Sequence, residues 1–268
     1  MNPFPVSWIH GSLNCSTNAD APLQAHACDA DTFIIRQNKC HNFEGPFMYL
    51  LIGAQKALLL DTGASPSAGH PLPMRTTVDS LVPPSRSLIV AHSHSHADHC
   101  FGDEQFAARP NTTVIQPNFS AMCDFFGFHD WPNDVAMLDL GKRKLAVVPI
   151  PGHESTHICV YDEATQILMT GDTLYPGLLV INDLPAYRAS AARLKRFADG
   201  KAITYILGAH IEMKRPPGPL YPIGTRYQPD EHVLQLTRAH LDAWSDAVAD
   251  IGNNPQPVVR DDFVLQPP

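Results

Sequence analysis

Five side chains that can bind a metal ion lie within eight residues of this chain. They are His92, His94, His96, Asp98 and His99. The apolar run at residues 87–90 comes just before them and has the β-branched content of a buried strand. Because alternate side chains of an extended segment point the same way, His94 and His96 can face one point together. A helix starting after them would present Asp98 and His99 to a second point. Imidazole and carboxylate ligands suit zinc, iron or manganese.

The pattern His94-x-His96-x-Asp98-His99 at the end of an apolar strand resembles the signature of the metallo-β-lactamase superfamily. Three further matches follow in the expected order, each at the end of an apolar run. They are Pro-Gly-His153, Gly-Asp172 and Gly-Ala-His210. The resemblance covers roughly residues 32–210 and implies a site for two metal ions.

The resemblance assigns a role to each of these residues. It implies that one metal is bound by His94, His96 and His153, and that the other is bound by Asp98, His99 and His210. Asp172 matches the carboxylate that bridges the two metals, which offsets the repulsion between two cations about 3.5–4 Å apart. Asp61 and His157 match residues that hold the ligands or their loop in place from behind.

Such a site predicts hydrolysis of a small molecule. We expect two Zn²⁺ ions, with iron or manganese as the other metals that these ligands suit. A zinc-bound hydroxide, available near neutral pH, would attack the acyl carbon of an ester, thioester, lactone or lactam. Asp98 or Asp172 could then pass a proton to the leaving group. Tyr175 resembles the tyrosine that acyl-homoserine lactonases direct at the substrate carbonyl, although a loop tyrosine packed beside Pro176 is an equal alternative.

Two other functions fit the same motifs. A persulfide dioxygenase would use a single iron, and a metal-binding protein without turnover would bind metal for interaction alone. The persulfide dioxygenases and glyoxalase II have a basic, Gly-rich stretch after the bridging Asp, which residues 174–177 lack. A count and identification of the bound metals separates the hydrolase from the dioxygenase.

Composition limits the partners and the location. The chain has 268 residues and a net charge of −8, which argues against a nucleic-acid partner held through phosphates. No apolar run approaches the roughly 20 residues of a membrane helix, and the first residues lack the features of a signal peptide. We therefore expect a cytoplasmic protein whose six cysteines are free thiols, with an N-terminal disulfide as the alternative in an exported protein. No feature of the sequence indicates an oligomeric state.

The order of apolar runs predicts one α+β domain over residues 1–268. By resemblance it is an αββα sandwich, in which two mixed sheets face each other with helices outside. Residues 1–31 are expected to wrap over the domain as a loop, and the aromatic-rich residues 117–135 to form a loop over the site or over the core. Residues 211–268 are expected to contain a loop, a helix over 229–251 and a last edge strand at 263–265.

Overall fold

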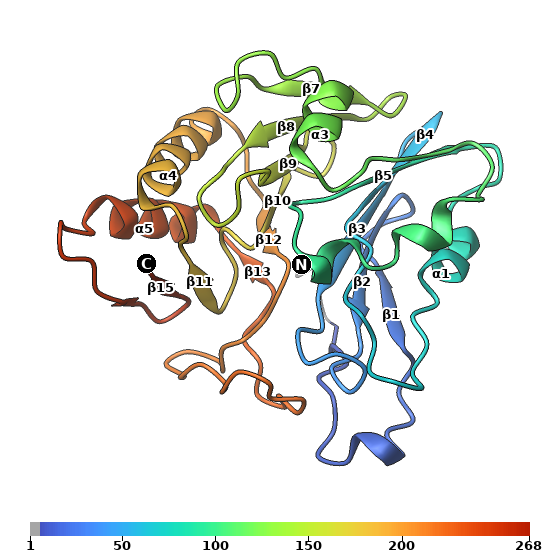
Figure 1. Ribbon diagram of the computed structural model, residues 1–268, viewed down its shortest axis with the longest axis horizontal. Coiled ribbons are helices and arrows are strands. Elements are labelled where there is room, and N and C mark those ends of the chain that lie inside the picture. Colours follow the sequence, from blue (N-terminus) through green and yellow to red (C-terminus); the bar gives the residue numbers. More distant parts are fainter. Residues whose placement is uncertain (1–5) are drawn as a thin grey trace.

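Two β-sheets packed face to face form the centre of the molecule (Figure 1). The computed structural model describes residues 6–268. The first sheet is six-stranded, in the order β1 (Leu23–Ala27), β2 (Thr32–Gln37), β3 (Phe47–Ile52), β4 (Lys56–Leu60), β5 (Ser87–Ala91) and β6 (Thr112–Val114). Its first four strands are antiparallel neighbours, whereas β4, β5 and β6 run parallel. The carboxyl ends of β4 and β5 therefore lie at one edge.

The second sheet is also six-stranded and mixed. Its order is β13 (Gln235–Leu236), β12 (Tyr205–Gly208), β10 (Ile167–Gly171), β9 (Ile158–Asp162), β8 (Lys144–Pro149) and β7 (Ala136–Asp139). Strands β10 and β12 are parallel, and the other pairs are antiparallel. The carboxyl ends of β10 and β12 consequently lie together, as those of β4 and β5 do in the first sheet.

Apolar side chains fill the space between the sheets and beneath the outer helices. Helix α1 (Met74–Leu81) packs on the outer face of the first sheet, and α4 (Leu184–Ala198) and α5 (Arg238–Ala249) pack on the outer face of the second. Arg143, next to β8, also joins the sheets, because its guanidinium donates to Asp162 of β9 and to the Ile52 carbonyl of β3. The αββα arrangement expected from the sequence is confirmed.

Several local expectations were wrong. Residues 1–31 are not only a loop, since they include β1 and the 3-10 helix η1 (Cys15–Thr17). The aromatic-rich segment contains helix α3 (Phe119–Phe126), with Asn118 as its N-cap and Gly127 in the left-handed conformation at its end. The last helix begins at residue 238 and not at 229, because β13 is extended and pairs with β12.

The C-terminal strand is central, not an edge strand. Strand β15 (Val264–Gln266) lies between β11 (Leu178–Val180) and β14 (Val258–Val259) in a small third sheet. It pairs in parallel with β11, which follows the segment carrying Asp172 and Tyr175. The chain end thereby supports one side of the candidate site.

A disulfide joins Cys15 and Cys40, so the expectation that all six cysteines are free thiols was wrong. The antiparallel pairing of β1 with β2 folds the N-terminal segment back on the β2–β3 loop, where the Asn38 amide donates to the Pro22 carbonyl. The other four cysteines are free. Among the described residues, no helix has the length and apolar character needed to cross a membrane.

Candidate metal centre

The seven predicted metal ligands meet at the edge where the parallel strands of both sheets end. His94 and His96 lie in the loop after β5, and Asp98 and His99 lie in the short helix α2 (Ala97–Cys100) that follows. The other three are His153 after β8, Asp172 after β10 and His210 after β12. Carboxyl ends of parallel strands commonly carry such side chains, because the loops that follow them gather at one edge. The structure therefore brings all seven together.

The first group of ligand atoms comprises His94, His96, His153 and Asp172, whose atoms all lie within 4.8 Å of one another. His96 Nδ1 lies 2.9 Å from His94 Nε2 and 3.2 Å from His153 Nε2. The Asp172 Oδ2 atom is 3.8 Å from His94 Nε2 and 3.6 Å from His153 Nε2. Three imidazole nitrogens and one carboxylate oxygen thus surround one point.

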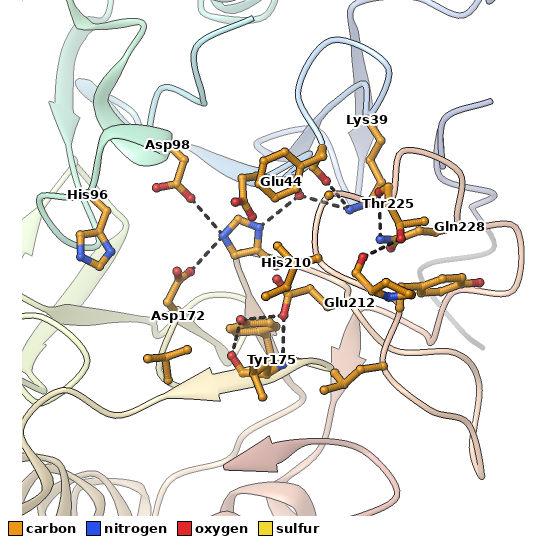
Figure 2. Close-up of a pocket in the computed structure, with 18 of the residues that line it drawn as sticks. Lys39, Glu44, His96, Asp98, Asp172, Tyr175, His210, Glu212, Thr225 and Gln228 are labelled. Atoms are coloured by element: carbon orange, nitrogen blue, oxygen red, sulfur yellow. Dashed lines mark hydrogen bonds and ion pairs between the residues drawn. The ribbon is translucent and has the colours of Figure 1, made fainter. Parts of the chain in front are cut away.

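The second group comprises Asp98, His99, Asp172 and His210, again within 4.8 Å of one another. His99 Nε2 lies 3.1 Å from Asp98 Oδ2 and 3.5 Å from Asp172 Oδ1. His210 Nε2 lies 3.4 Å from Asp98 Oδ2 and 3.3 Å from Asp172 Oδ1 (Figure 2). Asp172 offers one oxygen to each group, which is the position expected of a bridging ligand.

Acceptors behind three of the imidazoles fix which ring nitrogen faces the centre. His153 Nδ1 lies 2.9 Å from the Val180 carbonyl, and His210 Nδ1 lies 3.3 Å from the Glu44 carbonyl. His99 Nδ1 lies 3.1 Å from the Asp61 carboxylate. Because each acceptor requires Nδ1–H, each Nε2 keeps its lone pair for the centre.

The donor set and its burial fit metal ions. His99 Nε2 and Asp172 Oδ1 are buried, and their nearest polar neighbours are other candidate ligand atoms at 3.1–3.5 Å, an arrangement that a bound cation would stabilise. Nitrogen and oxygen ligands without a thiolate suit zinc, iron or manganese in a site that reacts with substrate. Cys100, the nearest thiol in the sequence, instead donates to the His96 carbonyl.

The two groups of ligands differ in the pKa values of their histidines. Burial lowers the pKa of His94 well below its usual range, and it also lowers that of His96, so these rings are neutral. Burial, the largest single effect, would lower the pKa of His99 and His210 too, but the neighbouring carboxylates, with Asp172 the strongest among them, together outweigh it and hold both pKa values well above their usual range. The second group therefore carries excess negative charge, which a cation would neutralise in place of protons.

Residues behind the ligands hold them in position. Asp61 accepts from the Ser93 amide through Oδ1 at 2.7 Å and lies beside His99 through Oδ2. His157 Nε2 accepts from the Asp172 amide at 3.1 Å, and burial lowers the His157 pKa to about 3. Both lie where the resemblance places supporting residues. His92 points away from the centre, with its Nε2 atom 3.1 Å from Asp103.

A cavity of about 270 Å³ opens beside the metal ligands (Figure 2). Tyr175 lines it, but its hydroxyl contacts Glu212 Oε2 at 3.0 Å and the Leu178 carbonyl at 2.8 Å. Its ring packs edge-on against His210. The hydroxyl would have to leave Glu212 to reach a substrate carbonyl, so the predicted catalytic role of Tyr175 stays a prediction.

Several cavity residues were not predicted from the sequence. Glu44 and Glu212 line the cavity with Lys39, a buried lysine whose ammonium donates to the Phe43 and Glu44 carbonyls. Glu44 and Val180 hold histidines through backbone carbonyls, which any residue type could provide. Only the position of Glu212, two residues after His210, could have drawn attention to it.

Comparison with known proteins identifies the family. The family model described as "Metallo-beta-lactamase superfamily" matches residues 41–210, more than half of the chain. The acyl-coenzyme A thioesterase MBLAC2 of Gallus gallus is 23% identical over 62% of this chain and 72% of its own length. A hydroxyacylglutathione hydrolase of Pectobacterium carotovorum is 32% identical, but over only 31% of this chain and 32% of its own length.

Solved structures share the fold. The metallo-β-lactamase FIM-1 of Pseudomonas aeruginosa, in its mono-zinc form, superposes with a TM-score of 0.57 at 14% identity and covers 87% of this chain and 97% of its own. A metallo-β-lactamase of Pontibacter korlensis gives a TM-score of 0.54 at 15% identity, and the match covers 85% of this chain and 99% of that protein's chain. Together with the family match and the arrangement of the His and Asp side chains, this similarity shows that the chain belongs to the metallo-β-lactamase superfamily.

Proposed function

We propose that this protein is a hydrolase that uses two zinc ions to cleave a small thioester or ester. The observation that carries the proposal is the position of Asp172, which offers one oxygen to each of two groups of ligand atoms. A single iron would occupy only one of these two groups. The proposed ligands are His94, His96 and His153 for one metal, and Asp98, His99 and His210 for the other, with Asp172 shared.

Two bound divalent cations would supply Lewis acidity, which activates water near neutral pH and stabilises negative charge on the substrate oxygen. The protein supplies position and proton transfer. The acceptors behind His99, His153 and His210 hold these rings in one orientation. Asp98 has a side chain that is 25% exposed and lines the cavity, so its carboxylate can take a proton and return it to the leaving group. Asp172 is the second candidate for this transfer.

Thioesters are the first substrates to test. The relatives at the sequence level are named as an acyl-coenzyme A thioesterase and hydroxyacylglutathione hydrolases. Esters, lactones and lactams belong in the same panel, because attack at each begins at a carbonyl carbon. The cavity volume of about 270 Å³ supports a small substrate group.

The test is metal analysis of the purified protein followed by turnover on the panel. We expect two equivalents of metal per chain, mainly zinc, and hydrolysis of at least one thioester or ester. Removal of the metal with a chelator should abolish turnover, and zinc should restore it. One tightly bound iron without a second metal would favour the persulfide dioxygenase. Two metals without turnover on any member of the panel would favour a protein that only binds metal.

We also propose that residues 6–268 form one domain, because the C-terminal strand β15 pairs with β11 beside the site; the first five residues of the predicted domain lie outside the described residues. The cytoplasmic location stays a prediction. A disulfide between Cys15 and Cys40 is unusual in a reducing compartment. A count of free thiols on protein kept under native redox conditions, compared with the count after reduction, tests that location.

A further inference from the structure

One wall of the cavity comes from residues 220–225, the wall segment, which lie beyond the region matched by the family model. This segment belongs to the extended chain between β12 and β13 (Figure 1). Its side chains at the cavity include Leu220, Tyr221 and Ile223. Phe43, Leu178 and Val180 also line the cavity. The cavity thus has apolar side chains on its walls, and polar side chains such as Lys39, Thr225 and Gln228 also line it away from the metal ligands (Figure 2).

Ile223 is the most informative residue of the wall segment. Its side chain is 87% exposed although it lines the cavity. A single exposed apolar side chain needs no explanation by itself. Here, however, it stands with other apolar side chains at the mouth of the cavity that contains the metal ligands. An apolar group bound there would cover Ile223 and remove its surface from water.

Contacts to three other parts of the chain hold the wall segment in place. The Tyr221 amide donates to the Glu212 carbonyl at 2.8 Å, and the Tyr221 hydroxyl accepts from the Asp230 amide at 3.0 Å. Just after the segment, Arg226 donates to the Cys40 carbonyl and to Ser67 Oγ. Because these contacts fix the backbone, Ile223 is presented at the mouth without the cost of ordering a loop on binding.

Charge indicates which half of a substrate enters the cavity. Glu44 and Glu212 line it, and neither forms an ion pair with a basic side chain in the described part of the chain. The single buried ammonium, that of Lys39, is already engaged by two backbone carbonyls. Two carboxylates in a confined space disfavour an anionic group. An uncharged chain is the group that suits both the carboxylates and the apolar wall.

From these observations we infer that the cavity binds an uncharged, apolar acyl chain, with Ile223 as a residue that determines chain-length specificity. The inference rests on the proposed function and names its substrate class: thioesters or esters of straight-chain aliphatic acids. The scissile carbonyl lies at the metal ligands and the acyl chain runs along the wall segment. The leaving group, which is charged in many natural thioesters, remains outside at the solvent side.

Two isomeric thioesters test the direction of binding on the zinc-loaded protein. S-ethyl thiooctanoate carries its long chain on the acyl side, and S-octyl thioacetate carries it on the leaving group. We expect a higher kcat/KM for S-ethyl thiooctanoate. We expect Ile223→Ser to lower that value about tenfold, or about 1.4 kcal/mol, because the bound chain covers the apolar side chain at this position only in part. For S-ethyl thioacetate, whose acyl group is shorter, the loss in kcat/KM should be smaller than for S-ethyl thiooctanoate.

Leu13→Ser is the matched control, because Leu13 is also 87% exposed and does not line the cavity. It should leave both isomers unaffected. An Ile223→Ser protein with unchanged kinetics on S-ethyl thiooctanoate would overturn the inference. A loss confined to S-octyl thioacetate would also overturn it, because the long chain would then lie on the leaving-group side.

A binding measurement separates this inference from the proposed function. Calorimetric titration with octanamide, an uncharged chain that lacks a good leaving group, should give a dissociation constant that Ile223→Ser raises about tenfold. If no thioester is hydrolysed but octanamide binds in this way, the proposed function fails and the apolar chain site stands. If thioesters are hydrolysed but octanamide binds wild type and Ile223→Ser equally, the inference fails and the proposed function stands.

Discussion

His99 Nδ1 lies 3.1 Å from Asp61 Oδ2, while Asp61 Oδ1 accepts from the Ser93 amide in the loop that leads to His94. One buried carboxylate therefore connects the two groups of ligand atoms from behind. Its position is fixed where β4 ends, and its φ of 70° lies in the left-handed region that Asp and Asn tolerate better than most residues.

Asp61→Asn should weaken metal binding without disturbing the backbone. Asn also tolerates a positive φ, but its amide cannot accept from His99 and Ser93 as the carboxylate does. We expect metal affinity at the second group to fall about 10–100-fold, as for other residues that support metal ligands. Competition with a chromogenic chelator measures this. The control is Asp246→Asn, which removes one exposed ion pair with Lys195 and should bind metal like wild type. Equal metal affinity of wild type, Asp61→Asn and Asp246→Asn would contradict the prediction.

Asp172→Ala tests the shared ligand. Without this carboxylate two cations would repel each other at short range, so one metal should be lost or bound much more weakly. Turnover should fall by several orders of magnitude. Metal content per chain, measured together with kcat, checks both effects. A variant that kept two metals and full activity would eliminate the two-metal proposal.

Tyr175→Phe separates a catalytic hydroxyl from a packing residue. The variant keeps the ring against His210 and should retain both metals. Because the hydroxyl already contacts Glu212 and the Leu178 carbonyl, we expect kcat to change less than about tenfold. A loss of about 10²–10³-fold with intact metal content would instead assign Tyr175 the role of an oxyanion donor.

The meeting of the seven candidate ligands could be predicted from the sequence because each lies within a few residues of the end of an apolar strand. A strand that ends at the sheet edge leaves little freedom for the next few residues, so the positions of His153, Asp172 and His210 follow from the topology. The supporting carbonyls of Glu44 and Val180 could not be predicted, since a backbone acceptor carries no residue signature. They depend on the chain path in three dimensions.

Elements outside the motifs were harder to predict. Helix α3 has an N-cap at Asn118 and a terminal Gly127, and both signals are readable, but the Pro, Gly and Asp content of residues 117–135 favoured a loop. Residues 229–237 have the composition of a helix start. Pairing of Gln235 and Leu236 with β12 keeps them extended, and such a tertiary contact overrides local preference.

Removal of the Cys15–Cys40 disulfide should destabilise the protein. The two cysteines are 25 residues apart, and in a chain-entropy model a loop of this size corresponds to about 3 kcal/mol of the free energy of unfolding. The double variant Cys15→Ser, Cys40→Ser should therefore have a lower denaturation midpoint than wild type. A thiol reductant should lower the midpoint of wild type but leave the double variant unchanged. A reductant effect of equal size on both proteins would show that another change is responsible.

Because of Lys39, the free energy of unfolding should change with pH in the alkaline range. Burial lowers the pKa of its ammonium from 10.5 to about 8 in the folded protein. Between these two values the unfolded chain binds a proton that the folded chain does not, so this group makes stability rise as pH increases from about 8 to 10.5. Lys39→Met removes the titrating group. The free energy of unfolding of wild type minus that of Lys39→Met should therefore increase over this range, by at most about 3.4 kcal/mol. Urea denaturation of both proteins at matched pH values measures the difference, and a constant difference would show that Lys39 remains charged in the folded state.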